Sequence, residues 1–257
     1  MVGKTKGEKM RYLRYLCLRY LRPIKLNLSD EEALRDVSEF LGCSLKELLP
    51  KARLKDTPEE DKLWREKNRR TKQDYRDYYS KNIHYLERQD YYHRKADMSF
   101  LYLIKERGFL LDYGCGTGMI DFHAKLKRPD IKLFLVDIPE AITKEYCIWR
   151  LRKYGIDFKW YDIPYSEDIK FKEKYDFIRC RDVLEHTFHP LKVVKTFFDS
   201  LNVGGYLDVD FVFDPQCKKE NTPEAQAARE KTLAFIENNF KVLYAKRKTG
   251  RYLCQKR

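Results

Sequence analysis

With 257 residues, of which 43% are hydrophobic and 14% aromatic, the chain can form a sizeable core, and this composition excludes a wholly disordered protein. Its apolar runs are far shorter than the ~18 residues that a membrane-spanning helix needs, and residues 1–25 lack the apolar centre of a secretory signal peptide. The net charge of +13 lies at the ends: residues 1–25 and residues 241–257 each carry +7, so the body between them is close to neutral.

The first hundred residues predict a helical region. Leucines and tyrosines recur at helical spacing among arginines over residues 10–22. Three later start signals each precede a helical pattern, and two of them are capping boxes, in which a serine and a glutamate three residues on cap each other's backbone amides. These signals are Ser29 with Glu32, Ser44 with Glu47, and Thr57-Pro58-Glu59-Glu60. We therefore expect residues 1–104 to form a helical N-terminal cap region.

The pattern changes near residue 108, where short apolar runs begin to alternate with helical stretches. Such alternation predicts an α/β fold built from βαβ units in a mainly parallel sheet. The last two runs are separated only by a turn around Gly250, too short for a crossover, so they are expected to form an antiparallel hairpin. The predicted strands lie near residues 109–113, 132–136, 158–161, 176–180, 205–212, 240–245 and 251–255, with helices between the first six.

Residues 109–118 carry the strongest local signal. A buried strand runs into a loop with glycines at every second position, Gly114, Gly116 and Gly118, and then into a helix. Glycine lets a ligand approach bare backbone, and amides at the start of a helix point at whatever binds there. The spacing differs from the Gly-x-Gly-x-x-Gly of dinucleotide enzymes. Asp112, before the loop, would repel a pyrophosphate but suits a ligand that carries an ammonium group.

On these residues the chain resembles the class I S-adenosylmethionine-dependent methyltransferases, over about residues 105–257. Residues 112–118 are similar to the first motif of that family, and residues 181–186 (Arg-Asp-Val-Leu-Glu-His) and 201–207 (Leu-Asn-Val-Gly-Gly-Tyr-Leu) are similar to two later ones. The resemblance implies a Rossmann-like, seven-stranded domain with S-adenosyl-L-methionine as cofactor and S-adenosyl-L-homocysteine as product.

The resemblance also implies which residues bind the cofactor. Asp137 would accept hydrogen bonds from the ribose hydroxyls, Asp162 would meet the adenine amino group, and Asp182 lies beside the expected methyl donor. For Asp112, Asp137 and Asp182, capping of a helix is the alternative role. The expected set is Asp112, Gly114, Cys115, Gly116, Gly118, Asp137, Ile138, Asp162, Ile163, Arg181 and Asp182.

Methyl transfer needs mainly a positioned and desolvated acceptor, with a base where the acceptor is a hydroxyl or an ammonium. The candidate bases are His186, His189 and Asp214, and the spacing singles out none of them. Tyr78 and Tyr79, ahead of the first strand of the sheet, are expected to cover the cofactor and meet the acceptor, because tyrosine offers cation–π contact to a sulfonium. Ordinary aromatic packing is the alternative for both.

No metal is expected. The seven cysteines are widely spaced with no Cys-x-x-Cys pair, which indicates neither a disulfide framework nor a zinc site and fits a reducing cytoplasm. No cluster of His, Asp and Glu shows metal-ligand spacing either.

The sequence therefore predicts a cytoplasmic, S-adenosylmethionine-dependent methyltransferase that acts on a small-molecule, sugar-like or lipid-linked metabolite by in-line transfer. One alternative is an RNA or protein methyltransferase that uses the basic termini, although no RNA-binding module is recognisable. Another is a catalytically idle fold that serves as a binding module. The apolar stripe and arginines of residues 10–22 are also typical of membrane-surface helices. Packing of the stripe on the protein's own body is the first interpretation, and peripheral membrane contact and polyanion binding are the alternatives.

Overall fold

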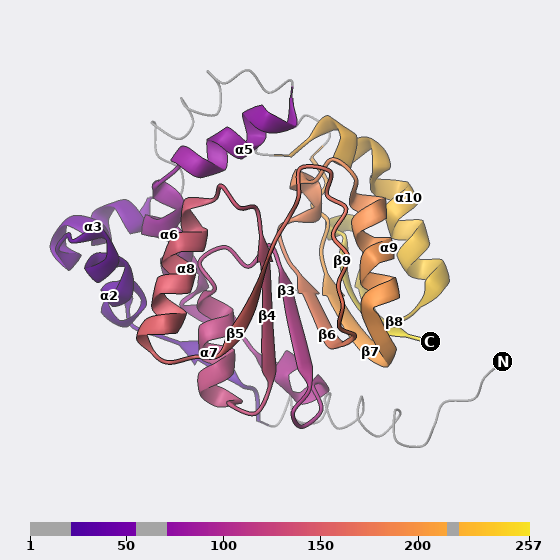
Figure 1. The fold of residues 1–257 in the computed structure, drawn as a ribbon, viewed down its shortest axis with the longest axis horizontal. Coiled ribbons are helices and arrows are strands. Elements are labelled where there is room, and N and C mark those ends of the chain that lie inside the picture. Colours follow the sequence, from indigo (N-terminus) through magenta and orange to yellow (C-terminus); the bar gives the residue numbers. More distant parts are fainter. Residues whose placement is uncertain (1–21, 55–70, 215–220) are drawn as a thin grey trace.

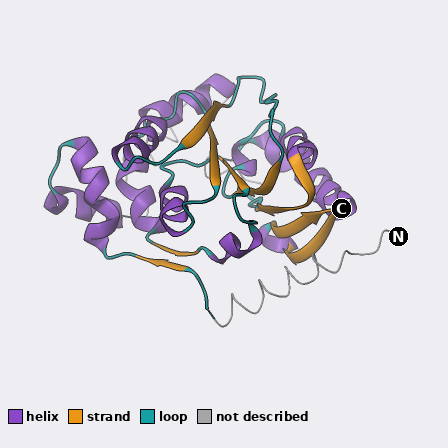
Figure 2. Cartoon of the chain, turned by 60° about the horizontal axis from the view of Figure 1, so that its bottom comes forward, coloured by secondary structure: helices purple, strands orange, loops and turns teal. Residues whose placement is uncertain are grey.

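The computed structural model describes residues 22–54, 71–214 and 221–257. A central sheet carries helices on both faces, and a group of N-terminal helices lies on the side of the molecule away from the C-terminus (Figures 1 and 2). Apart from Arg22, the helix predicted over residues 10–22 lies outside the described residues, as does the start of the helix predicted at Thr57. Within the described ranges, no helix is both long and apolar enough to cross a membrane.

The sheet confirms the predicted α/β fold. Its strand order is β5-β4-β3-β6-β7-β9-β8; neighbours from β5 to β7 are parallel, and β9 runs antiparallel to both β7 and β8, as the predicted hairpin requires. The strands are β3 (Phe109–Tyr113), β4 (Lys132–Asp137), β5 (Phe158–Asp162), β6 (Tyr175–Cys180), β7 (Leu201–Val209), β8 (Phe240–Lys246) and β9 (Arg251–Lys256).

Alternate residues of the central strands enter two separate cores, one on each face of the sheet. On β4, Leu133 and Leu135 pack with α7 and α8. Phe134 and Val136 pack with α9 and α10 on the other face (Figure 1). Because both faces are covered, this strand is continuously apolar instead of alternating. The helices are α7 (Met119–Lys127), α8 (Ile142–Lys153), α9 (Pro190–Ser200) and α10 (Pro223–Asn239).

One predicted helix is wrong: residues 163–174 join β5 to β6 without any helix. Pro164 disfavours the helical conformation at Ile163 before it. Ile163 and Ile169 are both buried in the core beneath α9 and α10, which holds the segment against the sheet. The connection therefore runs without a helix from the carboxyl end of β5 to the amino end of β6, since these strands are parallel.

The N-terminal helices begin where the capping boxes predicted. Ser29 and Ser44 each accept the backbone N–H of a glutamate three residues on, and each glutamate side chain accepts the serine N–H in return. A two-stranded antiparallel sheet that the sequence did not predict also lies here, since strands of three residues are too short to show an alternating pattern. The elements are β1 (Lys25–Asn27), α2 (Asp30–Leu41), α3 (Leu45–Arg53), α5 (Lys72–Lys81), α6 (His84–His93), β2 (Lys95–Asp97) and the 3-10 helix η1 (Ser99–Leu103).

A buried ion pair joins the N-terminal helices to the sheet. Asp90 on α6 accepts hydrogen bonds from Arg150 Nη1 at 2.5 Å and from the Tyr146 hydroxyl at 2.7 Å, both on α8. The two charged side chains are no more than 2% exposed. Arg150 Nη2 also donates to the carbonyl of Thr117 in the glycine loop, at 2.5 Å. One guanidinium therefore holds both the N-terminal region and the loop.

Replacing Asp90 with asparagine is expected to lower the free energy of unfolding by about 3–5 kcal/mol, because Arg150 stays buried without its counter-charge. Urea denaturation measures this loss. Asp168→Asn is the matched control: its carboxylate is 47% exposed and pairs with Lys192 at 3.1 Å, so it should cost less than about 1 kcal/mol. Equal losses in the two variants would contradict the structural role of the Asp90–Arg150 pair.

Candidate functional site

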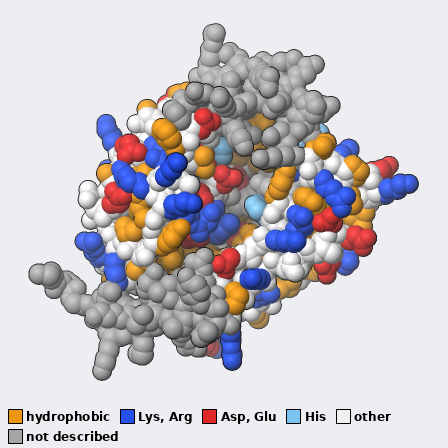
Figure 3. Space-filling model, turned by 180° about the vertical axis from the view of Figure 1, so that it is seen from behind, with side chains coloured by type: hydrophobic (Ala, Val, Ile, Leu, Met, Phe, Trp, Pro, Cys, Tyr) orange, Lys and Arg blue, Asp and Glu red, His pale blue; other side chains and the backbone are white. Residues whose placement is uncertain are grey.

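A cavity of about 1570 Å³ lies at the carboxyl ends of the parallel strands. The strand order reverses at β3, whose neighbours β4 and β6 lead in opposite directions, and open α/β sheets bind ligands at such a point. α5 and α6 line one side of the cavity and the β8–β9 hairpin lines another. Figure 3 shows a hollow near the centre of one face, with acidic, basic and histidine side chains around it. The volume exceeds the 300–1,000 Å³ of an ordinary small-ligand site.

The glycine loop forms part of the cavity wall and adopts backbone angles that side chains disfavour. A Cβ at Gly116 would overlap Gln89 Oε1, and one at Gly118 would overlap the Cys147 sulfur. Gln89, on α6, also accepts the Thr117 N–H at 2.9 Å. The sequence analysis missed this glutamine, because nothing local distinguishes it from other polar residues of a helix. The φ angles are +77° at Gly114, +55° at Gly116 and +64° at Gly118.

Asp137 ends β4 beside this loop and lines the cavity. Its Oδ2 accepts the Gly116 N–H at 2.8 Å, and its Oδ1 accepts the Ile138 N–H at 2.7 Å. Each carboxylate oxygen can accept a second hydrogen bond, so the two hydroxyls of a ribose fit this acceptor. Burial raises the pKa of Asp137 to about 6.

Asp112 lies behind the cavity wall. Arg179 Nη1 on β6 donates to Asp112 Oδ2 at 2.6 Å, and Asp112 is only 1% exposed. Arg179 lines the cavity, whereas Asp112 does not. The expected contact between Asp112 and an ammonium group therefore needs correction, because its charge is neutralised by Arg179 and is turned away from the ligand space. Burial beside the Asp112 carboxylate raises the pKa of Asp121, on α7, well above its usual range.

Asp162 also lies elsewhere than expected. Its carboxylate accepts hydrogen bonds from Lys144 Nζ at 2.6 Å and from Trp160 Nε1 at 2.8 Å, and it does not line the cavity. The expected contact with an adenine amino group is corrected accordingly, and the neighbouring Ile163 takes its place on the wall. Of the other residues expected to bind the cofactor, the cavity wall includes Gly114, Cys115, Gly116, Ile138, Arg181 and Asp182.

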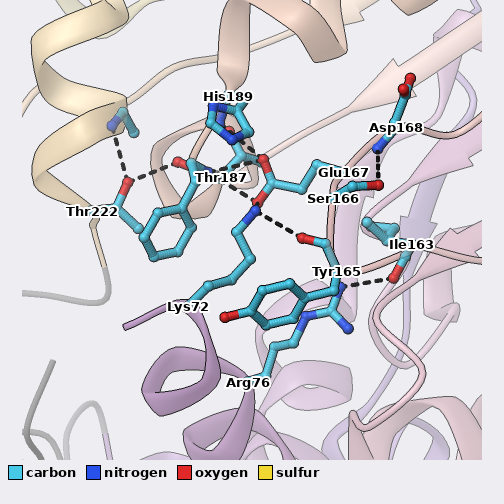
Figure 4. A network of polar contacts seen from close by, with 12 residues as sticks. Lys72, Arg76, Ile163, Tyr165, Ser166, Glu167, Asp168, Thr187, His189 and Thr222 are labelled. Carbon is cyan, nitrogen blue, oxygen red and sulfur yellow. Dashed lines mark hydrogen bonds and ion pairs between the residues drawn. The ribbon is translucent and has the colours of Figure 1, made fainter. Parts of the chain in front are cut away.

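The structure separates the three candidate bases. His186 lines the cavity. The His189 side chain is exposed at the start of α9 and outside the cavity wall, and its backbone N–H donates to Glu167 at 2.9 Å (Figure 4). Asp214 also lies outside, where its Oδ2 accepts from Asn221 at 3.3 Å. His189 and Asp214 are therefore withdrawn as bases, because neither carboxylate nor imidazole reaches the ligand space.

A second histidine of the cavity wall comes from the N-terminal region. His93 is the last residue of α6 and lines the cavity. Burial, reinforced by the charge of Arg179, lowers the pKa of His93. A neutral imidazole at this position can accept a proton. The sequence analysis assigned no chemistry to His93, because only the packing of α6 brings it to the strand ends.

The two candidate tyrosines of α5 have different surroundings. Tyr79 lines the cavity, and its ring centroid lies 6.2 Å from that of His186. Tyr78 is buried and does not line the cavity; its ring packs edge-on against that of Tyr85 with 6.2 Å between centroids. The packing alternative therefore describes Tyr78, whereas Tyr79 faces the ligand space.

Two cations hold α5 against the loop that follows β5 (Figure 4). Lys72 Nζ donates to the Tyr165 carbonyl at 2.8 Å and pairs with Glu167 at 3.2 Å. Arg76 donates to the Ile163 carbonyl at 2.8 Å, beside the cavity wall. These contacts come from residues almost a hundred positions apart in sequence, and they place α5 along the edge of the cavity.

The part of the cavity wall beside Arg179 is charged, since Asp208 on β7 is the register partner of Arg179 on β6. Arg181, after β6, pairs with Asp210, and Arg251, on β9, pairs with Asp208 at 2.8 Å. Burial raises the pKa of Asp208 to about 6. The sequence analysis missed three of these four residues, because the register of β7 and β9 brings them together and no motif marks them.

Comparisons with known proteins show the family of this chain. Residues 73–242 match the family described as a methyltransferase domain. This range begins inside the predicted cap region, so the domain boundary at residue 104 stays a prediction. A tRNA U34 carboxymethyltransferase from Sulfurovum sp. (strain NBC37-1) is 31% identical over 131 residues, which cover 49% of this chain and 41% of that protein. The chain thus matches less than half the length of this curated relative.

Two solved structures illustrate the similarity in fold. An S-adenosylmethionine-dependent methyltransferase from Clostridium acetobutylicum ATCC 824 is 16% identical, with a TM-score of 0.44, over 57% of this chain and 83% of that one. PKMT2 from Rickettsia typhi, solved in complex with AdoHcy, is 19% identical, with a TM-score of 0.39, over 51% of this chain and 28% of that one. Similarity at this level does not bear on the acceptor.

Asp137→Asn is expected to weaken binding of S-adenosylhomocysteine by about 1.5–3 kcal/mol, because the ribose hydroxyls lose a charged acceptor. Isothermal titration calorimetry measures the change, with a thermal melt to check that the variant folds. Asp162→Asn is the control, since that carboxylate ends the adjacent strand but lies outside the cavity. A loss of affinity in Asp162→Asn equal to that in Asp137→Asn would contradict the assignment.

Affinity for the same ligand is expected to fall as the pH drops through about 6, the pKa of Asp137. Protonation removes the charged acceptor, so Kd should rise by up to about tenfold per pH unit below that value. The stability of the ligand-free protein depends on pH in the opposite direction. The raised pKa of Asp137 stabilises the folded state at low pH, and this contribution is lost as pH rises through about 6. Ligand titrations between about pH 5 and pH 8 should show this dependence of Kd on pH in the wild type, and a Kd that does not change with pH in Asp137→Asn.

Proposed function

The chain belongs to the methyltransferase domain family, and from this premise we propose that it is an S-adenosylmethionine-dependent methyltransferase whose acceptor is a small-molecule, sugar-like or lipid-linked metabolite. One observation carries the proposal. The glycine loop, the α5 tyrosine and the charged residues Arg181, Asp208, Asp210 and Arg251 belong to a single cavity of about 1570 Å³, bordered by helices of the same chain. Such a chamber has room for a cofactor and a compact acceptor together.

The residues of the donor end fit the proposed cofactor. Asp137 would hold the ribose, and the left-handed glycines leave the loop backbone open to the ligand. Arg179 lines the same wall, with its guanidinium beside the loop strand, and would meet the carboxylate of the methionine portion. S-adenosylmethionine, when bound, supplies a methyl group on a positively charged sulfur.

The acceptor end offers groups that position and deprotonate. Tyr79 and His186 lie together on the wall, and His93 adds a second imidazole from α6. His93, with its lowered pKa, would take the proton of an acceptor hydroxyl or ammonium. The ion pairs of Arg181 and Arg251 lie on the same cavity wall and would orient a polar acceptor there. An active enzyme accounts for these groups better than a catalytically idle binding module does.

A tRNA acceptor is the second candidate. The curated relative at 31% identity is named as a tRNA-modifying enzyme, and each terminal segment of this chain carries +7, a charge suited to phosphates. A nucleoside of the tRNA would have to be flipped into the cavity to reach the cofactor. Membrane contact through residues 10–22, which would suit a lipid-linked acceptor, remains a proposal about residues outside the described ranges.

A transfer assay with methyl-tritiated S-adenosylmethionine distinguishes these acceptors. The full chain is incubated separately with a low-molecular-weight metabolite fraction, a lipid extract and total tRNA. We expect label in the metabolite or lipid fraction, reduced by Asp137→Asn and retained by Asp162→Asn. Label that appears mainly in tRNA would contradict a small-molecule acceptor and favour the second candidate.

A further inference from the structure

A tight turn after β6 gathers three side chains that can ligate a metal. Asp182, at φ +59°, is followed by the 3-10 helix η2 (Leu184–His186). One ligand atom each from Asp182, Glu185 and His186 lie within 4.8 Å of one another. The turn is held from outside the cluster, because Asp182 N–H donates to Asp210 at 2.5 Å.

Glu185 is the unusual member of this cluster. It is 1% exposed, and neither carboxylate oxygen has a hydrogen-bond partner among the described residues. No Lys or Arg of the described ranges forms an ion pair with Glu185 or with Asp182. A buried carboxylate without a donor or a cation is unfavourable, and such groups in folded proteins are normally satisfied. A ligand that supplies positive charge would satisfy it.

The position of the cluster relates it to the reaction. Asp182 and His186 line the cavity, and Glu185 lies behind them. His186 lies beside Tyr79 of α5, so the cluster faces the acceptor side and not the ribose side. A cation held between these residues would have protein on the Glu185 side and the cavity on the other.

We propose that Asp182, Glu185 and His186 bind a divalent metal ion at the wall of the cavity. Two carboxylates and one imidazole suit ions such as Mn²⁺, and three protein ligands leave coordination positions for oxygen atoms in the cavity. An acceptor with neighbouring oxygens, such as a vicinal diol or a hydroxy acid, would complete the coordination; this second statement rests on the proposed function. The sequence analysis expected no metal, because Asp-x-x-Glu-His becomes a cluster only through the strained turn.

Mn²⁺ binding to the full chain tests the site without any cofactor or acceptor. After purification with a chelator and dialysis, Mn²⁺ is titrated, and the free ion is followed by its electron paramagnetic resonance signal. We expect saturable binding that Glu185→Gln and Asp182→Asn each weaken by at least about tenfold. Glu145→Gln, on the exposed face of α8, is the matched control and should bind as the wild type does.

Two variants are used because Glu185→Gln changes a buried residue and could disturb the fold, whereas Asp182 is exposed, so its replacement tests the metal site with less risk of misfolding. Saturable binding that both variants weaken supports the metal site, whether or not a small-molecule acceptor emerges from the transfer assay. Absence of saturable binding by the wild-type chain overturns the site, and so does equal affinity in the wild type and both variants. If the metal binds but chelation leaves transfer to an identified diol or hydroxy-acid acceptor unchanged, the coordination of the acceptor is overturned while the site stands.

Discussion

The architecture of the cavity depends on how the buried Arg150 is satisfied. A guanidinium inside a protein needs a counter-charge and further acceptors. Asp90 on α6 supplies the charge, and the Thr117 carbonyl in the glycine loop supplies an acceptor. One side chain of α8 therefore sets the distance between the N-terminal region and the loop. α6 in turn places Gln89 against the loop and His93 on the cavity wall, so both sides of the site depend on this pair.

The remaining charges of the cavity are mostly neutralised within the protein. Three arginines, two at the end of β6 and one at the start of β9, each have an aspartate partner, so a ligand meets fixed dipoles in place of mobile water. Glu185 differs, because its oxygens have no such partner among the described residues. A methyltransferase of this family needs little more than position at the donor end. Residues of α5, α6 and the β8–β9 hairpin complete the cavity wall. The three pairs are Arg179–Asp112, Arg181–Asp210 and Arg251–Asp208.

Most of the fold follows from local patterns in the sequence. Capping boxes predict helix starts because the bonds they make are between neighbours, and Ser29 and Ser44 do cap α2 and α3. Continuous apolar runs predict strands buried on both faces, and the run at residues 132–137 is one. The helix expected between β5 and β6 fails for a local reason that was visible, since Pro164 disfavours it.

The sequence by itself determined the fold family, the glycine loop and the position of Asp137, because strand ends and tight turns are encoded over a few consecutive residues. Only the tertiary structure decided which polar side chains reach the cavity. Asp137 and Asp162 end adjacent strands in register, yet Asp162 is bound by Lys144 at the sheet edge. His93 enters the site and His189 does not. Such outcomes depend on the packing of elements distant in sequence, and one residue of shift or one competing ion pair changes where a side chain points.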